Sequence, residues 1–216
     1  ANATLTPKVL WLWSCATTTA NAYAENFVQS YGFSDGTTDY CTMIQSQDNQ
    51  GTMIVQTGCY ATGVIAFATI GTTTTRALAD VFSFSAGRFE LNWAISDTTP
   101  DIIHYMVMGG TDITNVKVVS KNMGTAAGNV SYTGVGFQGD FVNLITYGNT
   151  IAGTIANSSS TVSTWIMGAA TSATAEWMFG GSSEHNAGSA DTYNYKEITA
   201  CLGNYESGTG SVTGLA

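Results

Sequence analysis

The chain has 216 residues, of which 44% are hydrophobic and only 10% are charged. Because disorder requires low hydrophobicity and high charge, this composition predicts a folded protein. The net charge of −9 and the six scattered bases argue against a nucleic-acid surface, which needs clustered lysine and arginine. No apolar run approaches the roughly 18 residues of a membrane-spanning helix, so we expect no membrane partner.

The surface must be covered mainly by Thr, Ser, Gly, Asn and Ala, because charged residues are so few. Neutral groups lose far less hydration energy than ions when they are buried against another protein. The composition therefore favours a protein that packs against copies of itself or against other subunits. The alternative is a secreted protein with a Thr/Ser-rich face.

The N-terminal stretch "KVLWLWSCATTTANA" has one base, a short apolar run and small residues, as a signal peptide does. Trp11 and Trp13 make a poor signal core, and we predict a strand here instead. Further along the chain, short segments rich in β-branched and aromatic residues are bounded by Gly, Asn, Asp and Ser, which is typical of strands. The candidate strands are Val9–Trp13, Met53–Gln56, Val64–Ile70, Val81–Phe84, Phe89–Ile95, Ile102–Met108, Val116–Val119, Val130–Phe137 and Phe141–Tyr147.

The clearest local prediction is a hairpin between two of these strands. Phe82 and Phe84, then Phe89, Leu91 and Trp93, alternate with polar or small residues, and "SAGR" stands between the two runs. Such alternation predicts one buried face and a tight turn. No helical stripe appears anywhere in the chain.

The sequence also carries a weak internal echo. The segment that begins at Tyr31 aligns with the segment that begins at Met167, with Gly32 on Gly168 and Cys41 on Trp177; "PKVLWLW" aligns with "GDFVNLI". The alternative is chance similarity between two Thr/Gly-rich segments. We predict an all-β fold, an antiparallel sandwich of jelly-roll type, with one full unit and part of a second. The corresponding domains are 1–128 and 129–216, although a single domain fits the pattern too.

The cysteines Cys15, Cys41, Cys59 and Cys201 match no zinc-site spacing, since no C-x-x-C occurs and the chain has only two histidines. We expect buried free thiols and no resident metal.

The stretch "TGVGFQGDF" places Gly134, Gly136 and Gly139 as in a dinucleotide-binding loop. That loop also needs a helix beginning within it and an acidic residue about 20 residues later. The following "DFVNLITYG" is β-branched and aromatic, and no acid occurs between Asp140 and Glu176. We therefore predict a bend between strands and no cofactor.

Catalytic candidates are few and each has a simpler interpretation. His104 lies in an apolar strand pattern, "SSEHN" places Ser182, Glu184 and His185 too close in sequence for a triad, and "SDGTTD" lacks the ligands that complete a calcium loop. Nothing singles out a carboxylate pair for glycoside cleavage among the 15 acids. We predict no catalytic residue.

Aromatic side chains near the C-terminus are the remaining candidates for contact with a partner. They are Tyr193, Tyr195, Tyr205, Trp165 and Trp177. If exposed, they could stack on sugars or anchor a neighbouring subunit; if buried, they belong to the core.

The block "HYMVMGGTDITNVKV", then "GNVSYTGVGFQGDFVNLIT", with "FSFSAGRFELNW" upstream and "GFSDGT" and "SQD" nearer the N-terminus, resembles a family of structural proteins of tailed bacteriophages. The resemblance spans about Pro7 to Thr146, and the family pattern has Pro where this chain has Gly139. It implies a virion protein built from β-sandwich units and supplies no catalytic residues to transfer.

Together these observations predict a structural component of a phage particle, a capsid coat, decoration or tail protein that is not an enzyme. It would act through contacts with copies of itself and with other virion proteins, as a homo-oligomer. The alternatives are a carbohydrate-binding module and, third, an enzyme that acts on polysaccharide.

Overall fold

The computed structural model describes residues 5–21, 23, 25–123, 130–147, 153–157, 164–186, 188, 192–206 and 211–213. All regular elements in these ranges are β-strands, and all strand pairs are antiparallel. The predicted all-β, antiparallel class is therefore confirmed. Within the described ranges, no helix long and apolar enough to cross a membrane is present.

The strands follow one another with short connections over most of the chain. They are β1 (Pro7–Ser14), β2 (Phe27–Ser34), β3 (Asp39–Gln47), β4 (Ile54–Tyr60), β5 (Ile65–Ala68), β6 (Thr75–Ser85), β7 (Arg88–Ile95), β8 (His104–Gly109), β9 (Val142–Thr146), β10 (Thr154–Asn157), β11 (Thr164–Ser172), β12 (Ala175–Ser183), β13 (Thr192–Glu197), β14 (Asn204–Glu206) and β15 (Ser211–Thr213).

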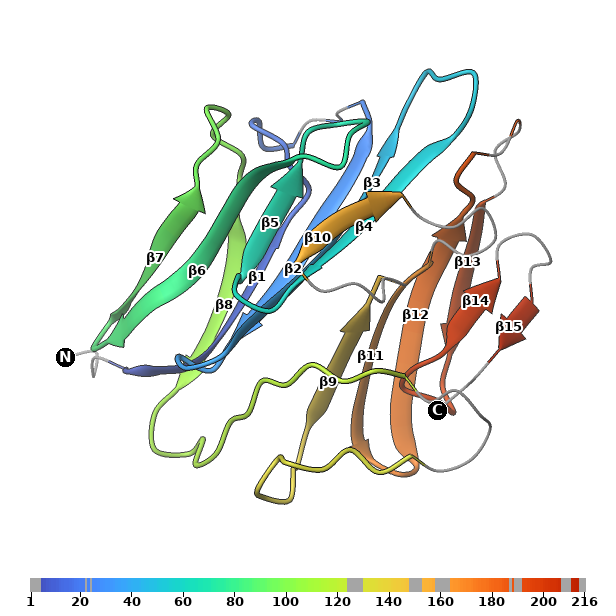
Figure 1. Ribbon diagram of the computed structural model, residues 1–216. Coiled ribbons are helices and arrows are strands. Elements are labelled where there is room, and N and C mark those ends of the chain that lie inside the picture. The colour runs from blue at the N-terminus through green and yellow to red at the C-terminus, as the bar shows by residue number, and fades with distance from the viewer. Residues whose placement is uncertain are drawn as a thin grey trace.

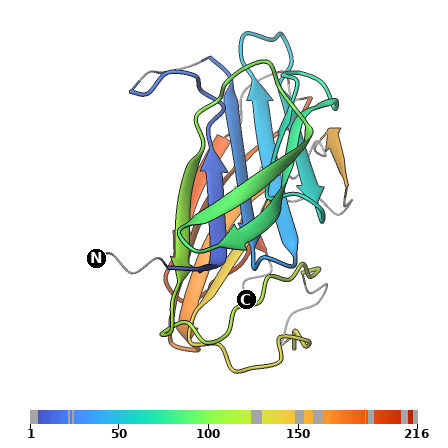
Figure 2. The ribbon, with the colours of Figure 1, turned by 90° about the vertical axis from the view of Figure 1, so that its left-hand side faces the viewer.

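Three main sheets build the molecule (Figure 1). The large sheet has the order β10-β4-β3-β2-β1-β8, the cover sheet β5-β6-β7, and the C-terminal sheet β13-β12-β11-β9; β14 and β15 form a separate pair. Figure 2 shows the cover strands lying across the blue strands of the large sheet. Two sheets packed face to face in this way form a sandwich.

The main core lies between the large sheet and the cover sheet. Leu10 and Leu12 of β1 alternate with partly exposed tryptophans, so that one face of the strand is fully buried. They join Ile65 and Phe67 of β5 in a single apolar cluster. The period-two pattern of β1 thus places its leucines inside the sandwich and its tryptophans on the opposite face.

The predicted hairpin is confirmed, but its predicted buried face is confirmed only in part. Phe84, Phe89 and Leu91 pack against the core, whereas Phe82 lies at a register shift and is 72% exposed. Ser85 pairs with Arg88 across a two-residue turn in which Gly87 has a φ of +77°, a value that glycine adopts without strain. The strand predicted at the N-terminus is also present as β1, paired with β2 on one side and β8 on the other.

Two predicted strands, Val116–Val119 and Val130–Phe137, are wrong, because both segments are irregular. In the first, the N–H of Val118 donates to the carboxylate of Asp35 at 3.0 Å instead of to a neighbouring strand. In the second, Gly134 and Gly136 have φ values of +92° and +85°, which interrupt an extended chain. A segment rich in β-forming residues therefore does not form a strand where a side-chain acceptor or a glycine conformation prevents pairing.

The C-terminal sheet lies against the face of the large sheet that points away from the cover sheet. Ile44 and Val55 of the large sheet cluster there with Tyr147, Ile145 and Trp165. The predicted division between 1–128 and 129–216 stays a prediction. Across that division, β10 pairs with β4 and so completes the edge of the large sheet.

Candidate functional site

One face of the C-terminal sheet carries a row of aromatic rings. Trp165 of β11 and Phe179 and Trp177 of β12 share this face, because Trp165 opposes Gly181, and Phe179 and Trp177 precede Gly181 by two and four positions. The Trp165 and Phe179 rings meet edge to face at 5.7 Å, and the Phe179 and Trp177 rings stack at 5.9 Å with 12° between their planes. The three rings form one continuous apolar row, called the aromatic row below.

The aromatic row runs from the core to the surface. Trp165 packs beside the buried cluster of Ile44 and Val55, whereas Phe179 is 40% exposed and Trp177 is 46% exposed. Phe179 was not among the residues predicted from the sequence. Its spacing of two from Trp177 in a strand was the available signal, because alternate residues of a strand share a face.

The predicted tyrosines do not belong to this row. Tyr193 opposes Ser182 and Tyr195 opposes Gly180, which places both on the other face of the C-terminal sheet. The hydroxyl of Tyr195 donates to the carboxylate of Glu197 at 2.9 Å. The side chain of Tyr205 lies outside the described residues. The structure thus brings Trp165 and Trp177 together and separates them from Tyr193 and Tyr195.

Glu197 closes the end of β13 with a set of hydrogen bonds. Its carboxylate accepts from the Thr199 hydroxyl at 2.8 Å, from the Ile198 N–H at 2.8 Å and from Tyr195. These donors, the Thr199 hydroxyl foremost, lower the pKa of Glu197 from 4.5 to about 2. The carboxylate therefore fixes the turn after β13, which is a structural role.

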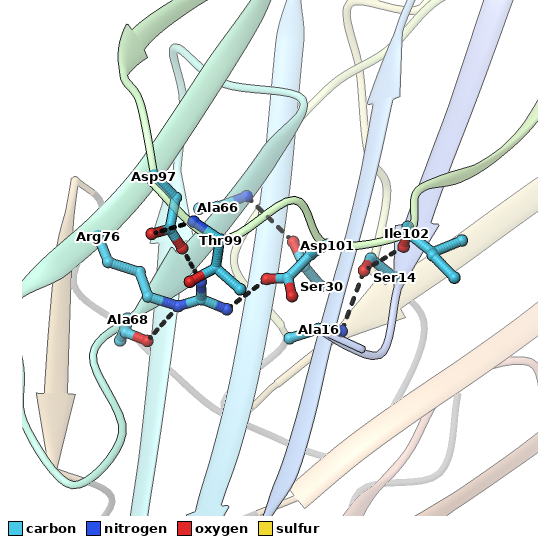
Figure 3. Close-up of polar contacts among 10 residues, drawn as sticks. All are labelled: Ser14, Ala16, Ser30, Ala66, Ala68, Arg76, Asp97, Thr99, Asp101 and Ile102. Atoms are coloured by element: carbon cyan, nitrogen blue, oxygen red, sulfur yellow. Dashed lines mark hydrogen bonds and ion pairs between the residues drawn. The ribbon is translucent and has the colours of Figure 1, made fainter. Parts of the chain in front are cut away.

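Arg76 of β6 and the carboxylates of Asp97 and Asp101 form an ion-pair cluster, called the clasp below (Figure 3). The Arg76 guanidinium makes ion pairs with Asp97 and Asp101, and its Nε donates to the Ala68 carbonyl oxygen at 3.1 Å. The same guanidinium lies over the Phe67 ring at 5.1 Å from its centroid. Ser14 extends the clasp by donating to the Ile102 carbonyl oxygen at 2.7 Å. This arrangement fastens the segment after β7 to the sandwich, and both carboxylates are engaged by the arginine.

Both histidines contact other residues of the fold, one through ring stacking and one through a hydrogen bond. His104 is exposed and stacks on Trp13 at 5.9 Å. The Nδ1 of His185 accepts from the N–H of Val55 at 3.0 Å, so that this imidazole links the C-terminal sheet to the edge of β4. The "SSEHN" turn therefore serves contact between sheets.

The remaining motifs also have local structural explanations. Asp35 accepts from Thr37 and Thr38 within the "SDGTTD" turn. Burial raises the pKa of Asp35, but hydrogen bonds from Thr37, Val118 and Thr38 outweigh it, and the pKa is lowered. Across the described residues, no cluster of three or more His, Cys, Asp or Glu side chains is placed to hold a metal ion.

The four cysteines form no disulfide, as we expected, but not all are buried. Cys41 is buried and Cys15 is exposed, whereas Cys59 and Cys201 are intermediate. Cys15 directly follows β1 at the sheet end, where the chain leaves the core. Burial, together with the nearby Cys59 and Asp39, raises the pKa of Cys41 well above 9.0.

Comparison with known proteins adds no relative. No family model matches the chain, and neither the curated proteins nor the solved structures contain a match.

Proposed function

We propose that this chain is a structural subunit that assembles with copies of itself, and that the assembly belongs to a bacteriophage particle. The observation that carries the first part is the exposed end of the aromatic row. Trp177 and Phe179 present two parallel rings to solvent on a sheet face that is continuous with the core. Aromatic anchors of this kind supply much of the binding free energy in protein interfaces.

Sheet edges offer a second mode of contact. The outer strands of the three main sheets are β10 and β8, β5 and β7, and β13 and β9. An outer strand presents backbone donors and acceptors that pair readily with another chain. With few charges at the surface, such edges have little electrostatic protection against pairing.

The phage assignment is supported by the sequence resemblance described above and agrees with an all-β sandwich. It implies location in the virion, as a capsid coat, decoration or tail protein, in contact with other virion proteins. The jelly-roll form of the sandwich, the absence of catalysis and the absence of nucleic-acid or membrane partners stay predictions of the same proposal.

Substitution in the aromatic row tests the role in assembly. Trp177→Ser with Phe179→Ser should weaken self-association at least 10-fold by sedimentation equilibrium in urea-free buffer, where urea unfolding shows that the variant is folded. Phe82→Ser is the matched control, since Phe82 is 72% exposed on the cover sheet, away from the row. Equal association of all three proteins would remove the aromatic row from the interface.

The parallel rings of Trp177 and Phe179 favour one second candidate, a carbohydrate-binding surface. Sugar rings stack on exposed aromatic faces, and Asn143 opposes Ala169 on the same face to offer a polar group. A glycan array separates the two functions. Binding that Trp177→Ser abolishes, in a protein that stays monomeric, would favour the carbohydrate module over the assembly subunit.

A further inference from the structure

The C-terminal sheet repeats the strand succession of the large sheet. In the large sheet β1, β2, β3 and β4 are consecutive neighbours; in the C-terminal sheet β9, β11, β12 and β13 are. Gly32 of β2 and Gly168 of β11 occupy the same place in this succession. A Cβ at Gly32 would overlap the Val64 carbonyl group, and a Cβ at Gly168 would overlap the Cys201 carbonyl group. In both sheets, therefore, the chain crosses back over the second strand directly above a glycine.

The pairing registers extend this equivalence to the fourth strands. Cys41 of β3 opposes Gly32 and Tyr60, whereas Met178 of β12 opposes Gly168 and Glu197. Tyr60 and Glu197 are thus counterparts. Counting back along each strand, Thr57 of β4 matches Asn194 of β13, and Gly58 matches Tyr195.

The sequence alignment of the two segments was one residue out of register after the second strand. Ser34 pairs with Asp39 in the first hairpin, and the equivalent pair in the second is Ala170 with Glu176. The second connection contains one residue more than the first and a register shift before its last pair, Ser172 with Ala175. With this insertion, the turn residue Asn49 matches Asn186. Both have positive φ, +55° and +63°. The shared backbone conformation supports the corrected alignment.

The edge of β4 is covered by a strand from the second unit. β10, which lies between β9 and β11 in sequence, pairs with β4 so that Ala156 opposes Thr57. The Gly153 N–H donates to the Cys59 carbonyl oxygen at 2.6 Å, and Gln56 donates to the Asn157 side chain at 3.0 Å. Ile155 is buried there with Met43. Strand addition at this edge is therefore well bonded.

The counterpart of β10 in the first unit lies between β1 and β2. The sequence there is "TTAN", Thr18–Asn21, against "TIAN" in β10. This segment forms bends and a turn, is exposed throughout, and includes Asn21 at a φ of +59°. The nearby Tyr23 is also fully exposed. In contrast to β10, the segment pairs with no strand in the described part of its own chain.

β13, the counterpart of β4, is the outer strand of the C-terminal sheet. We propose that Thr18–Asn21 of one copy adds to β13 of a second copy, as β10 adds to β4 within the chain. The expected pairing is antiparallel, with Ala20 opposite Asn194 and Thr18 opposite Lys196. This inference rests on the proposed function as a self-assembling subunit and specifies its interface.

The proposed contact is heterologous, because a segment of the first unit meets a strand of the second. Within one copy, β10 of the second unit adds to β4 of the first unit. Between copies, a segment of the first unit adds to β13 of the second unit. Such contacts generate rings if the rotation closes and filaments if it does not. Tyr23 becomes covered by the neighbouring copy, and Asn21 becomes extended, a change that asparagine accommodates readily.

Cysteine pairing between copies tests this register. In a Cys15→Ser background, a protein with Ala20→Cys is mixed with one carrying Asn194→Cys, and mild oxidation follows. Directly opposed residues have Cβ atoms near disulfide distance, whereas residues two positions along do not. The matched control is therefore Thr192→Cys in place of Asn194→Cys. We expect at least 10-fold more disulfide-linked heterodimer with Asn194→Cys than with Thr192→Cys.

A second variant measures the backbone contribution. Ala20→Pro removes an N–H that faces β13 in this register, because its counterpart Ala156 opposes Thr57 on the side of β4 that bonds β10. Ala20 lies in an exposed turn, so the urea midpoint should stay unchanged. Self-association should fall at least 10-fold. If the native protein assembles but Ala20→Pro assembles equally well, or both cysteine mixtures give equal yields, the strand-addition interface is wrong and the proposed function stands. If the native protein stays monomeric up to millimolar concentration, both are wrong.

Discussion

A methyl group added at Gly168 would overlap the backbone of the chain that crosses above β11. The built Cβ lies 2.7 Å from the carbonyl carbon of Cys201 and 3.1 Å from the carbonyl oxygen of Trp177, and it overlaps the Cys201 carbonyl oxygen more severely. At Gly32 the corresponding obstacles are the Val64 carbonyl group and, at 2.9 Å, the Cys41 Cβ. Because the obstructing atoms are mainly backbone, a side-chain rotation cannot relieve the overlap.

The magnitude follows from the cost of overpacking. One extra methyl group in a packed interior costs about 1–3 kcal/mol, and backbone displacement places these sites at the upper end, about 3 kcal/mol. For a chain of this size, each kcal/mol lowers Tm by about 2–4 °C, so Gly32→Ala and Gly168→Ala should each lower Tm by roughly 6–12 °C. Calorimetry and urea unfolding measure both effects.

Gly51→Ala is the matched control for these two variants. Nothing lies within 4 Å of its Cβ position, and its φ is not positive. An alanine there should be neutral or should stabilise by about 0.4–1 kcal/mol, because it restricts the unfolded chain. If Gly32→Ala and Gly168→Ala unfolded within about 0.5 kcal/mol of the native protein, the close crossing above both strands would be refuted.

Three further predictions concern charge and thiol chemistry. Arg76→Met leaves two partly buried carboxylates without their cation and should cost about 3–5 kcal/mol by urea unfolding; a loss below about 1 kcal/mol would contradict the clasp. Because the pKa of Glu197 is lowered from 4.5 to about 2, its stabilising contribution is complete above pH 4.5 and is lost as the pH falls through 2. Carbon NMR titration should show that low midpoint and its return toward 4.5 in Thr199→Ala; a native midpoint near 4.5 would refute the hydrogen-bond set. A thiol reagent should modify exposed Cys15 rapidly in the native protein and buried Cys41 only on unfolding; rapid loss of both thiols would contradict the burial of β3.

Alternation of side chains predicted those elements whose burial is one-sided. In the hairpin of β6 and β7, Phe84, Phe89 and Leu91 pack against the core and alternate with polar or small residues. The segment 130–137 has similar residues but is irregular, because Gly134 and Gly136 adopt positive φ. Glycine adopts positive and negative φ about equally readily, so residue type alone does not reveal which one it takes.

The sequence predicted only part of the candidate contact site, because its arrangement depends on how the strands pair. Aromatic content identified Trp165 and Trp177, but the division of Tyr193 and Tyr195 onto the opposite face depends on the pairing register of β12 with β13. The turn between β11 and β12 adds a second difficulty, because it contains one residue more than the turn between β2 and β3. A single additional residue moves every later side chain to the other face, and an alignment of weak similarity does not locate it.

Sedimentation equilibrium of the native protein, with electron microscopy of the same sample, tests self-assembly most directly. The account predicts concentration-dependent association into rings or filaments, in which successive copies repeat a single contact. A monodisperse monomer at every concentration, with no regular particles in the images, would contradict the proposed structural role.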